Sequence, residues 1–420
     1  MSELSIRSAD QAVDTVQPWL LRYRGLIAAE AIWLTFAANF NVGYLWGGDS
    51  QVAYAFLRAL VGSGQAGTGY QFGLALFEAP FYGIGRLMQD MGVETIGTHP
   101  TPEAAIAAGA VFYIGLALAF TYALLAKLGF RHPGLAATCA LFGSPLFYYG
   151  TFSPGQTHAV ETMLACAAIF LVYVGHTKGW PPMVAITTGF VLGVAPTVRY
   201  FLFVFGVGLV AMLLSTRRWR PAVTITVSAA VVLGLLLLLP AAIGVRLFAS
   251  GDPQTVLAFS PTSPIHMLFG ARRGLFFWTP LTFIAAIGLV RALMRANRRD
   301  RWFLSTVIVM AVLLILMQVS ITFWYAGWSF SQRYLTALYP MVAIGFASVI
   351  QWRAKIALGL AVPAVAWSLF LCMNMQTIGF DEHHDNVFSL ASRAGAQTPG
   401  AYAWGVWHIS HLRSLIHISG

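Results

Sequence analysis

Ionisable side chains interrupt a largely apolar sequence at only a few points, and one aspartate stands out among them. Asp49 follows two glycines at the end of the first long apolar stretch, and a helix-forming stretch begins at Ser50. A carboxylate in this position would either cap free backbone N–H groups or take a proton from a substrate hydroxyl. Asp49 is therefore a candidate catalytic base, with helix capping as the alternative.

Four arginines lie beside glycines and aromatic residues at the ends of apolar stretches. They are Arg199, Arg272, Arg273 and Arg333. Guanidinium groups bind phosphate oxygens in pairs, so these residues are candidates for holding a phosphate whose tail lies in lipid. Snorkelling to lipid headgroups is the alternative for each of them. The aromatic residues around Arg333 are candidates for substrate contact: Tyr325, Trp328 and Tyr334.

Three further residues are candidates for substrate binding because their side chains are costly to place in apolar surroundings. His158 and Glu161 are three residues apart at a predicted helix start, so they share one face of that helix. They would hold a proton or a sugar hydroxyl, or simply satisfy each other. Glu78 interrupts the apolar stretch 72–88, where pairing with an arginine for packing is the alternative.

A divalent cation, Mg²⁺ or Mn²⁺, is the one cofactor that the sequence suggests. Asp90 is followed by Glu94 and His99, and carboxylate oxygens are suitable ligands for such an ion. Asp49 is the second candidate ligand. A solvated acidic loop is the alternative reading of the segment around Asp90, and the three cysteines lie inside apolar stretches, where they indicate no metal site.

The composition excludes a soluble protein. Of the 420 residues, 58% are hydrophobic and only 10% are charged, against about 25% charged in soluble proteins. Continuous apolar runs such as 223–239 indicate membrane-spanning helices rather than the alternating strands of a barrel. The net charge of +10 has to be tested against membrane topology before it can suggest a nucleic-acid partner.

The sequence predicts an all-α polytopic membrane bundle of about eleven helices, at roughly 20 apolar residues per span. The predicted spans are 25–46, 104–126, 134–152, 157–175, 182–198, 200–216, 222–247, 277–294, 302–323, 335–351 and 356–375. The stretch 72–88 contains glycines and a proline, and we interpret it as an interfacial helix within a first outer loop over 47–103. Residues 1–375 then form one transmembrane module, followed by a short outer tail over 376–420.

The distribution of basic residues predicts the orientation. The segment before the first span, Lys178 and the loops near 127–131, 217–220, 291–301 and 353–355 together contain 16 of the 25 lysines and arginines, and all of them lie on one side of the predicted bundle. The positive-inside rule makes that side cytoplasmic, together with the N-terminus. The C-terminus and the candidate site residues are then extracytoplasmic. The net charge reflects topology, so we expect no nucleic-acid partner.

The candidate motifs, taken in chain order and all on the predicted outer side of the membrane, resemble those of the GT-C superfamily, which comprises integral membrane glycosyltransferases. The resemblance is to the bacterial relatives of protein O-mannosyltransferases and lipid A aminoarabinose transferases. It rests on residues 48–50, on 70–85 as a membrane-surface helix, and on the turn at 153–158. Arg199 after a proline-interrupted helix, residues 272–276 and residues 328–334 complete it.

The resemblance implies sugar transfer from a polyprenyl-phosphate donor to a lipid, glycan or protein acceptor at the outer face of a bacterial inner membrane. Asp49 would serve as base or metal-holding carboxylate, and Arg199 and Arg333, with Arg272 or Arg273, would bind the donor phosphate. A single direct displacement would invert the anomeric centre. Ser50 stands where the family often has a second acid, which leaves metal dependence open. A lipid-linked sugar flippase and a non-catalytic scaffold in contact with membrane lipids are the alternatives.

Overall fold

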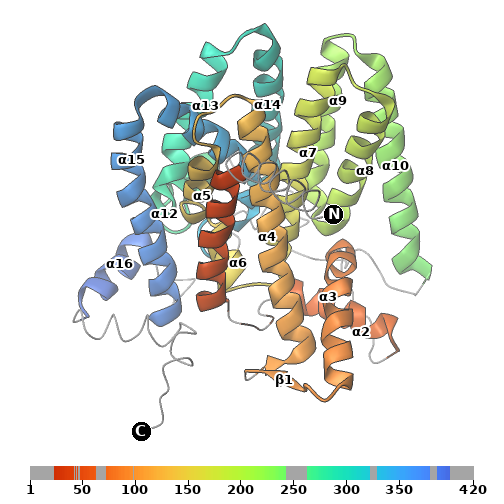
Figure 1. The fold of residues 1–420 in the computed structure, drawn as a ribbon, viewed down its shortest axis with the longest axis vertical. Helices are drawn as coiled ribbons and strands as arrows, with labels where there is room; N and C mark the ends of the chain where they lie inside the picture. Colours follow the sequence, from red (N-terminus) through yellow and green to blue (C-terminus); the bar gives the residue numbers. More distant parts are fainter. Residues whose placement is uncertain are drawn as a thin grey trace, which may run out of the picture.

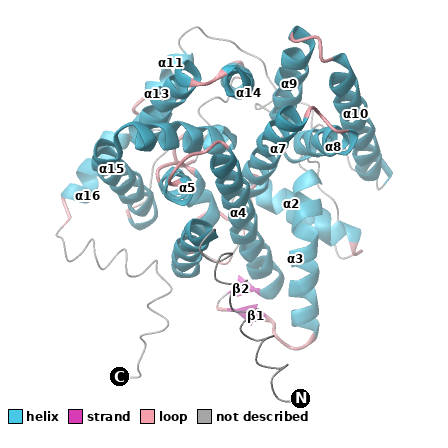
Figure 2. Ribbon diagram, turned by 45° about the horizontal axis from the view of Figure 1, so that its top comes forward, coloured by secondary structure: helices cyan, strands magenta, loops and turns pink. Residues whose placement is uncertain are grey.

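The computed structural model describes residues 23–41, 43, 45, 48–62, 72–97, 99–242, 263–321, 329–378 and 386–397. For residues 48, 49, 239–242, 394 and 395 it describes the backbone only. Within these ranges the chain is a bundle of helices, shown in Figure 1, with one small pair of strands, β1 (Thr95–Ile96) and β2 (His99–Pro100). The strands are antiparallel and lie just before α4 (Figure 2).

A first helix covers residues 23–40, and it is followed by the labelled elements of Figure 1. Their bounds are α2 (Gly48–Leu60), α3 (Phe72–Asp90), α4 (Thr101–Lys127), α5 (Pro133–Phe142), α6 (Leu146–Thr151), α7 (His158–Lys178), α8 (Pro182–Val198), η1 (Tyr200–Leu202), α9 (Phe203–Ser215), α10 (Trp219–Ala242), α11 (Ser263–Phe269), α12 (Leu275–Trp278), α13 (Pro280–Arg295), α14 (Arg298–Val319), η3 (Arg333–Leu338), α15 (Tyr339–Thr377) and α16 (Val387–Gly395).

The all-α membrane architecture expected from the sequence is confirmed. Five helical segments of the described chain are long and apolar enough to cross a membrane: Thr101–Lys127, His158–Lys178, Trp219–Leu238, Arg298–Val319 and Arg333–Thr377. Shorter apolar helices over Pro133–Phe142, Pro182–Val198 and Tyr200–Ser215 lie among them. The last long segment contains both predicted spans, 335–351 and 356–375, and the backbone leaves helical geometry between them, at Arg353 (φ −148°, ψ 78°).

The predicted span 134–152 is interrupted. The stretch 134–152 is two helices, α5 and α6, separated by Gly143, Ser144 and Pro145. Proline lacks a backbone N–H and cannot continue the helical ladder, while the Ser144 hydroxyl bonds back to the carbonyl of Leu141 at 3.2 Å. Hydropathy cannot detect this break, because all the residues around it remain apolar or small.

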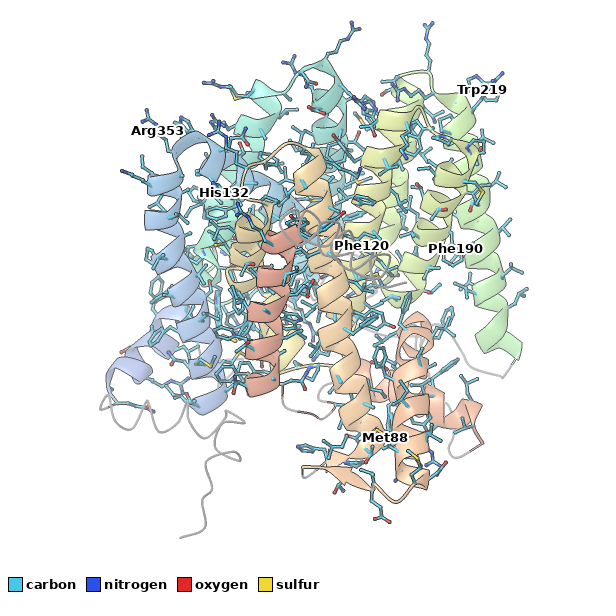
Figure 3. All side chains as sticks on the ribbon, in the orientation of Figure 1. Met88, Phe120, His132, Phe190, Trp219 and Arg353 are labelled. Carbon is cyan, nitrogen blue, oxygen red and sulfur yellow. The ribbon has the colours of Figure 1, made fainter. Side chains whose placement is uncertain are left out.

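The basic turns gather at one end of the bundle. Figure 3 shows His132, Trp219 and Arg353, from three different turns, toward the same end, and Met88 at the opposite end. We call the first the basic end and the second the site end. The Lys178 end of α7 belongs to the basic end, where the carbonyl of Thr177 accepts a hydrogen bond from Arg299 at 3.0 Å.

α3 was predicted as a membrane-surface helix, and it packs closely against the rest of the site end. Figures 1 and 2 show α2 and α3 beside the Thr101 end of α4, away from the basic turns. A Cβ at Gly85 would lie 2.5 Å from the Pro102 Cα, and one at Gly73 would overlap Thr197 at the end of α8. Glycine at these two positions lets α3 approach both helices closely.

Candidate active site

A buried ion pair lies at the centre of the site end. Arg199 and Glu161 are 2% and 0% exposed, and the guanidinium Nη1 lies 3.5 Å from the carboxylate Oε2. The same Nη1 donates to the hydroxyl of Thr157 at 2.6 Å and lies 3.3 Å from Nε2 of His158. A buried charge is tolerated only when paired and hydrogen-bonded, and Arg199 meets both conditions.

The second half of this cluster comes from η3, far away in the sequence. The Thr336 hydroxyl lies 3.0 Å from Oε1 of Glu161 and 3.2 Å from Nδ1 of His158. It also lies 3.0 Å from the carbonyl of Arg333, one 3₁₀ turn earlier. Glu161 is thus held from both sides, by Arg199 through one oxygen and by Thr336 through the other.

Aromatic rings enclose the cluster. The guanidinium carbon of Arg199 is 4.9 Å from the ring centre of Phe201 and 4.7 Å from that of Tyr334. The Tyr149 ring lies 4.2 Å from the His158 imidazole. Cation–π contacts of this kind are strongest where water is excluded, and the rings exclude it here.

The local backbone explains how Arg199 reaches this position. α8 contains Pro196 in its last turn and ends at Val198, and Arg199 takes an extended conformation (φ −150°, ψ 113°) before η1 begins. His158 and Glu161 occupy the first turn of α7, which follows a turn in which Gly155 has φ +75°. The predicted shared face of His158 and Glu161 is confirmed, with 3.5 Å between Nδ1 and Oε2.

The other candidate arginines have different environments. Arg333 is partly exposed, and its guanidinium carbon is 5.3 Å from the Tyr334 ring centre. Arg273 is only 1% exposed and lies over Trp278 at 5.7 Å, whereas Arg272 is exposed. The charges of Arg333 and Arg273 both act electrostatically on the Tyr149 hydroxyl.

Burial bears on the snorkelling alternative for two of the four arginines. Arg199 and Arg273 are buried among other side chains of the bundle, so neither guanidinium extends outward to lipid headgroups. The sequence alone could not show this for Arg199, because its partner Glu161 is on another helix and a hydropathy profile does not pair residues on different helices. The proposed phosphate contacts of all four residues stay predictions.

Asp49 lies in the first turn of α2, and its side chain is outside the described part of the structure. Its neighbour Ser50 is fully buried against the turn that precedes α7. A Cβ at Gly155 would lie 3.4 Å from the Ser50 Cβ and would overlap the Leu45 side chain. The backbone at Asp49 is therefore held next to the turn that leads into His158 and Glu161. Tyr325 and Trp328 lie outside the described residues.

Glu78 on α3 is buried in a small cavity between α3, α4 and the turn before α7. The cavity is lined by Tyr113, Gly155 and Gln156 among others. Both carboxyl oxygens of Glu78 lack a hydrogen-bond partner within the described chain. Burial raises the pKa of Glu78 well above its usual range, because the charged carboxylate loses its hydration there. The arginine partner considered for Glu78 is not found among the described residues.

The described residues do not gather the donors that a divalent cation requires. No three His, Cys, Asp or Glu side chains come together within them. Asp90 lies at the exposed end of α3 and faces Arg86 at 4.0 Å in an i, i+4 pair. The side chain of Asp49, the other candidate ligand, lies outside the described residues, so a metal held by Asp49 and Asp90 stays a prediction and we derive no chemical step through it.

Thr157, Thr336 and Tyr149 were missed by the sequence analysis. Threonine and tyrosine are common in membrane helices, where a hydroxyl often bonds to its own backbone. One signal in the sequence was available for Thr336. It follows Arg333 by three positions, and residues at positions i and i+3 lie on the same side of a 3₁₀ helix.

Fold and site together define a polytopic membrane helix bundle with a buried charged cluster near one end. No protein-family model and no curated protein matches the sequence. Among solved structures, the chain is similar to ArnT from Cupriavidus metallidurans bound to undecaprenyl phosphate, with a TM-score of 0.54 and 14% identity over 93% of this chain and 76% of ArnT. It is also similar to the oligosaccharyltransferase AglB from Archaeoglobus fulgidus in complex with an inhibitory peptide and a dolichol-phosphate.

For AglB the TM-score is 0.50 and the identity 12%, over 93% of this chain and 60% of AglB. At such identities the likeness concerns the fold. The GT-C-like fold expected from the sequence is confirmed by it.

Proposed function

We propose that this protein is a membrane glycosyltransferase that transfers a sugar from a polyprenyl-phosphate donor to an acceptor at the outer face of a bacterial inner membrane. The observation that supports this most is the convergence of α2, the turn before α7, the end of α8 and η3 on one buried charged cluster. Its fold is shared with two proteins whose structures contain undecaprenyl phosphate or dolichol-phosphate. A phosphate-linked lipid fits a site with an excess of arginine.

The charges divide into two groups with different roles. Glu161 neutralises Arg199, so this pair adds little net charge and instead fixes the end of α8 against α7. Arg333 and Arg273 add positive charge around Tyr149. In the proposed reaction these two arginines, with Arg272 at the exposed edge, stabilise the phosphate as it leaves the sugar.

Asp49 is the proposed base, because its backbone is held beside the turn that leads into this cluster. The acceptor hydroxyl attacks the anomeric carbon as the bond from that carbon to the phosphate oxygen breaks. Asp49 takes the hydroxyl proton, and the polyprenyl phosphate departs with the bonding electrons. One displacement inverts the anomeric centre.

His158, Glu161 and Tyr334 are proposed to position substrate through the inner wall of the site. Glu78, Tyr325 and Trp328 are proposed to contact substrate as well, the last two from outside the described residues. The basic end faces the cytoplasm in this proposal, by the positive-inside rule. The N-terminus is then cytoplasmic and the C-terminus extracytoplasmic.

The test compares glycans and glycolipids of the cell envelope, by mass spectrometry, in cells that lack the protein and in cells that express the wild type or Asp49→Asn. We expect one sugar on one acceptor to be lost without the protein and to remain absent with Asp49→Asn. Asp90→Asn is the matched control and should restore the sugar. Proteoliposomes that move a lipid-linked sugar across the bilayer with no acceptor modified would contradict the proposal and favour a flippase.

A further inference from the structure

The basic end contains a cavity lined by arginine side chains that helix packing does not require. It has a volume of about 250 Å³ and lies between the end of α13, the start of α14, the middle of α15 and the turn after α4. Arg291 and Arg295 line it, together with Ser348 and Gln351. A second cavity of about 110 Å³, lined by Arg131 and His132, shares Gln351 with the first.

The positive charge of this cavity is only partly balanced within the described chain. Asp300 is the one acid in its lining, and its carboxylate accepts a hydrogen bond from Asn297 at 2.8 Å. Neither Arg291 nor Arg295 forms an ion pair with it or with another described acid. The Arg291 guanidinium instead donates to the hydroxyl of the buried Ser348 at 3.3 Å.

An exposed apolar surface on α13 adjoins the arginines of this cavity. Ile287 precedes Arg291 by one helical turn on α13, and Val290 and Met294 flank the same face. All three are more than half exposed. Trp352 on α15 stacks against the Arg291 guanidinium at 5.0 Å and is itself 54% exposed. Tryptophan and arginine in contact are typical of the boundary between lipid tails and headgroups.

We infer that this cavity binds an anionic phospholipid of the leaflet at the basic end. The lipid phosphate lies on Arg291 and Arg295, and an acyl chain lies along Ile287, Val290 and Met294. The charge match selects an anionic headgroup, and the adjoining apolar face requires a lipid rather than a free phosphate. Basic pockets between membrane helices are suited to such headgroups because a guanidinium fork fits phosphate oxygens.

The second cavity extends the positive region beyond the two phosphate ligands. Arg131 and His132 are exposed at its rim, on the turn between α4 and α5. A bound headgroup would thus connect this turn with α13 and α15. The inference concerns the end of the bundle opposite the proposed transfer site, and it does not depend on the proposed function.

The experiment is native mass spectrometry of the purified full-length protein titrated with phosphatidylglycerol or phosphatidylcholine, without sugar donor. We expect phosphatidylglycerol to be retained in preference to phosphatidylcholine. Arg291→Gln with Arg295→Gln should weaken phosphatidylglycerol binding about 25-fold, at about fivefold for each arginine. The control removes two equivalent charges by Arg298→Gln with Lys355→Gln, because both residues are exposed at this end and neither lines the cavities. It should change binding less than twofold.

Equal losses in the two double variants would overturn the inference, since general surface charge would then explain the binding. Equal retention of the two lipids would also overturn it. Displacement of phosphatidylglycerol by millimolar inorganic phosphate would show a free-phosphate site instead. Should the double variant fail to fold, Arg295→Gln alone tests the same point. Its side chain is exposed, and we expect a loss of about fivefold.

Discussion

The guanidinium of Arg199 and the carboxylate of Glu161 lie 3.5 Å apart in the interior of the bundle, where both side chains are withdrawn from solvent. This pair joins the end of α8 to the start of α7. Its partners are Thr157 on one side and Thr336 on the other. The pair therefore holds together the three elements that would form the inner wall of a donor site.

Loss of one member of this pair should strongly destabilise the protein. Glu161→Gln leaves Arg199 buried without its counter-charge, at an expected cost of about 3 to 5 kcal/mol. Unfolding in mixed detergent micelles, followed by tryptophan fluorescence, measures this cost. Arg86→Gln is the control because it breaks the exposed Arg86–Asp90 pair, for which we expect less than about 1 kcal/mol. Equal effects of the two variants would contradict the structural role given to Glu161.

Replacement of Gly155 should separate the start of α2 from the charged cluster. Gly155 has φ +75°, and a Cβ there would overlap the Leu45 side chain and touch the Ser50 Cβ at 3.4 Å. Gly155→Ala should thus cost about 1 to 3 kcal/mol from overpacking, beyond about 1 to 2 kcal/mol for the left-handed backbone. Sugar transfer should fall with it, because the backbone at Asp49 shifts.

Gly179→Ala is the matched control for this substitution. Gly179 has φ +74° but no atom within 4 Å of an added Cβ, so only the backbone strain applies. We expect Gly179→Ala to lower the unfolding midpoint slightly and to retain transfer. Loss of transfer in both variants would mean that global stability, rather than the contact with Ser50, governs activity.

Glu78 should make the stability of the protein fall as pH rises. Burial holds the pKa of Glu78 well above the 4.5 of an exposed glutamate. Between these two pKa values the folded protein keeps the proton that the unfolded chain releases, so the free energy of unfolding decreases with pH. The loss is about 1.4 kcal/mol per pH unit within that window.

Glu78→Gln removes this titration. The variant should be more stable than the wild type at neutral pH, and the difference should shrink as pH falls toward 4.5. The measurement is the unfolding midpoint of each protein at a series of pH values from about 4 to about 8. Parallel curves over that range would show that Glu78 is not a buried neutral acid.

Arg333 should control affinity for a polyprenyl phosphate. It is the partly exposed arginine of the site, and its neighbour Tyr334 also contacts Arg199. We expect Arg333→Gln to weaken undecaprenyl phosphate binding by a factor of about 10 or more, since a charged hydrogen bond contributes about 1.5 to 3 kcal/mol. Arg333→Lys should recover part of the affinity. Tryptophan fluorescence titration measures both, and unaltered binding in Arg333→Gln would remove this residue from the phosphate site.

Much of the architecture could be predicted from the sequence, for a simple physical reason. A run of about 20 apolar residues has one stable arrangement in a membrane, so the helices from 104–126 to 356–375 were found with ends close to those observed. The basic turns could be predicted to lie at one end of the bundle, because successive spans cross the membrane in opposite directions and every second turn is on the same side. The break at Gly143 to Pro145 was missed, because it alters backbone geometry without altering hydropathy.

The sequence alone determined a polytopic helix bundle, the shared face of His158 and Glu161, and the set of polar residues worth suspecting. Only the tertiary structure decided which of these residues meet. Glu161 is 38 residues from Arg199 and 175 from Thr336, and such contacts depend on how helices pack rather than on local spacing. Burial was decided at the same level, because an arginine is stable inside a bundle only where another helix supplies its counter-charge.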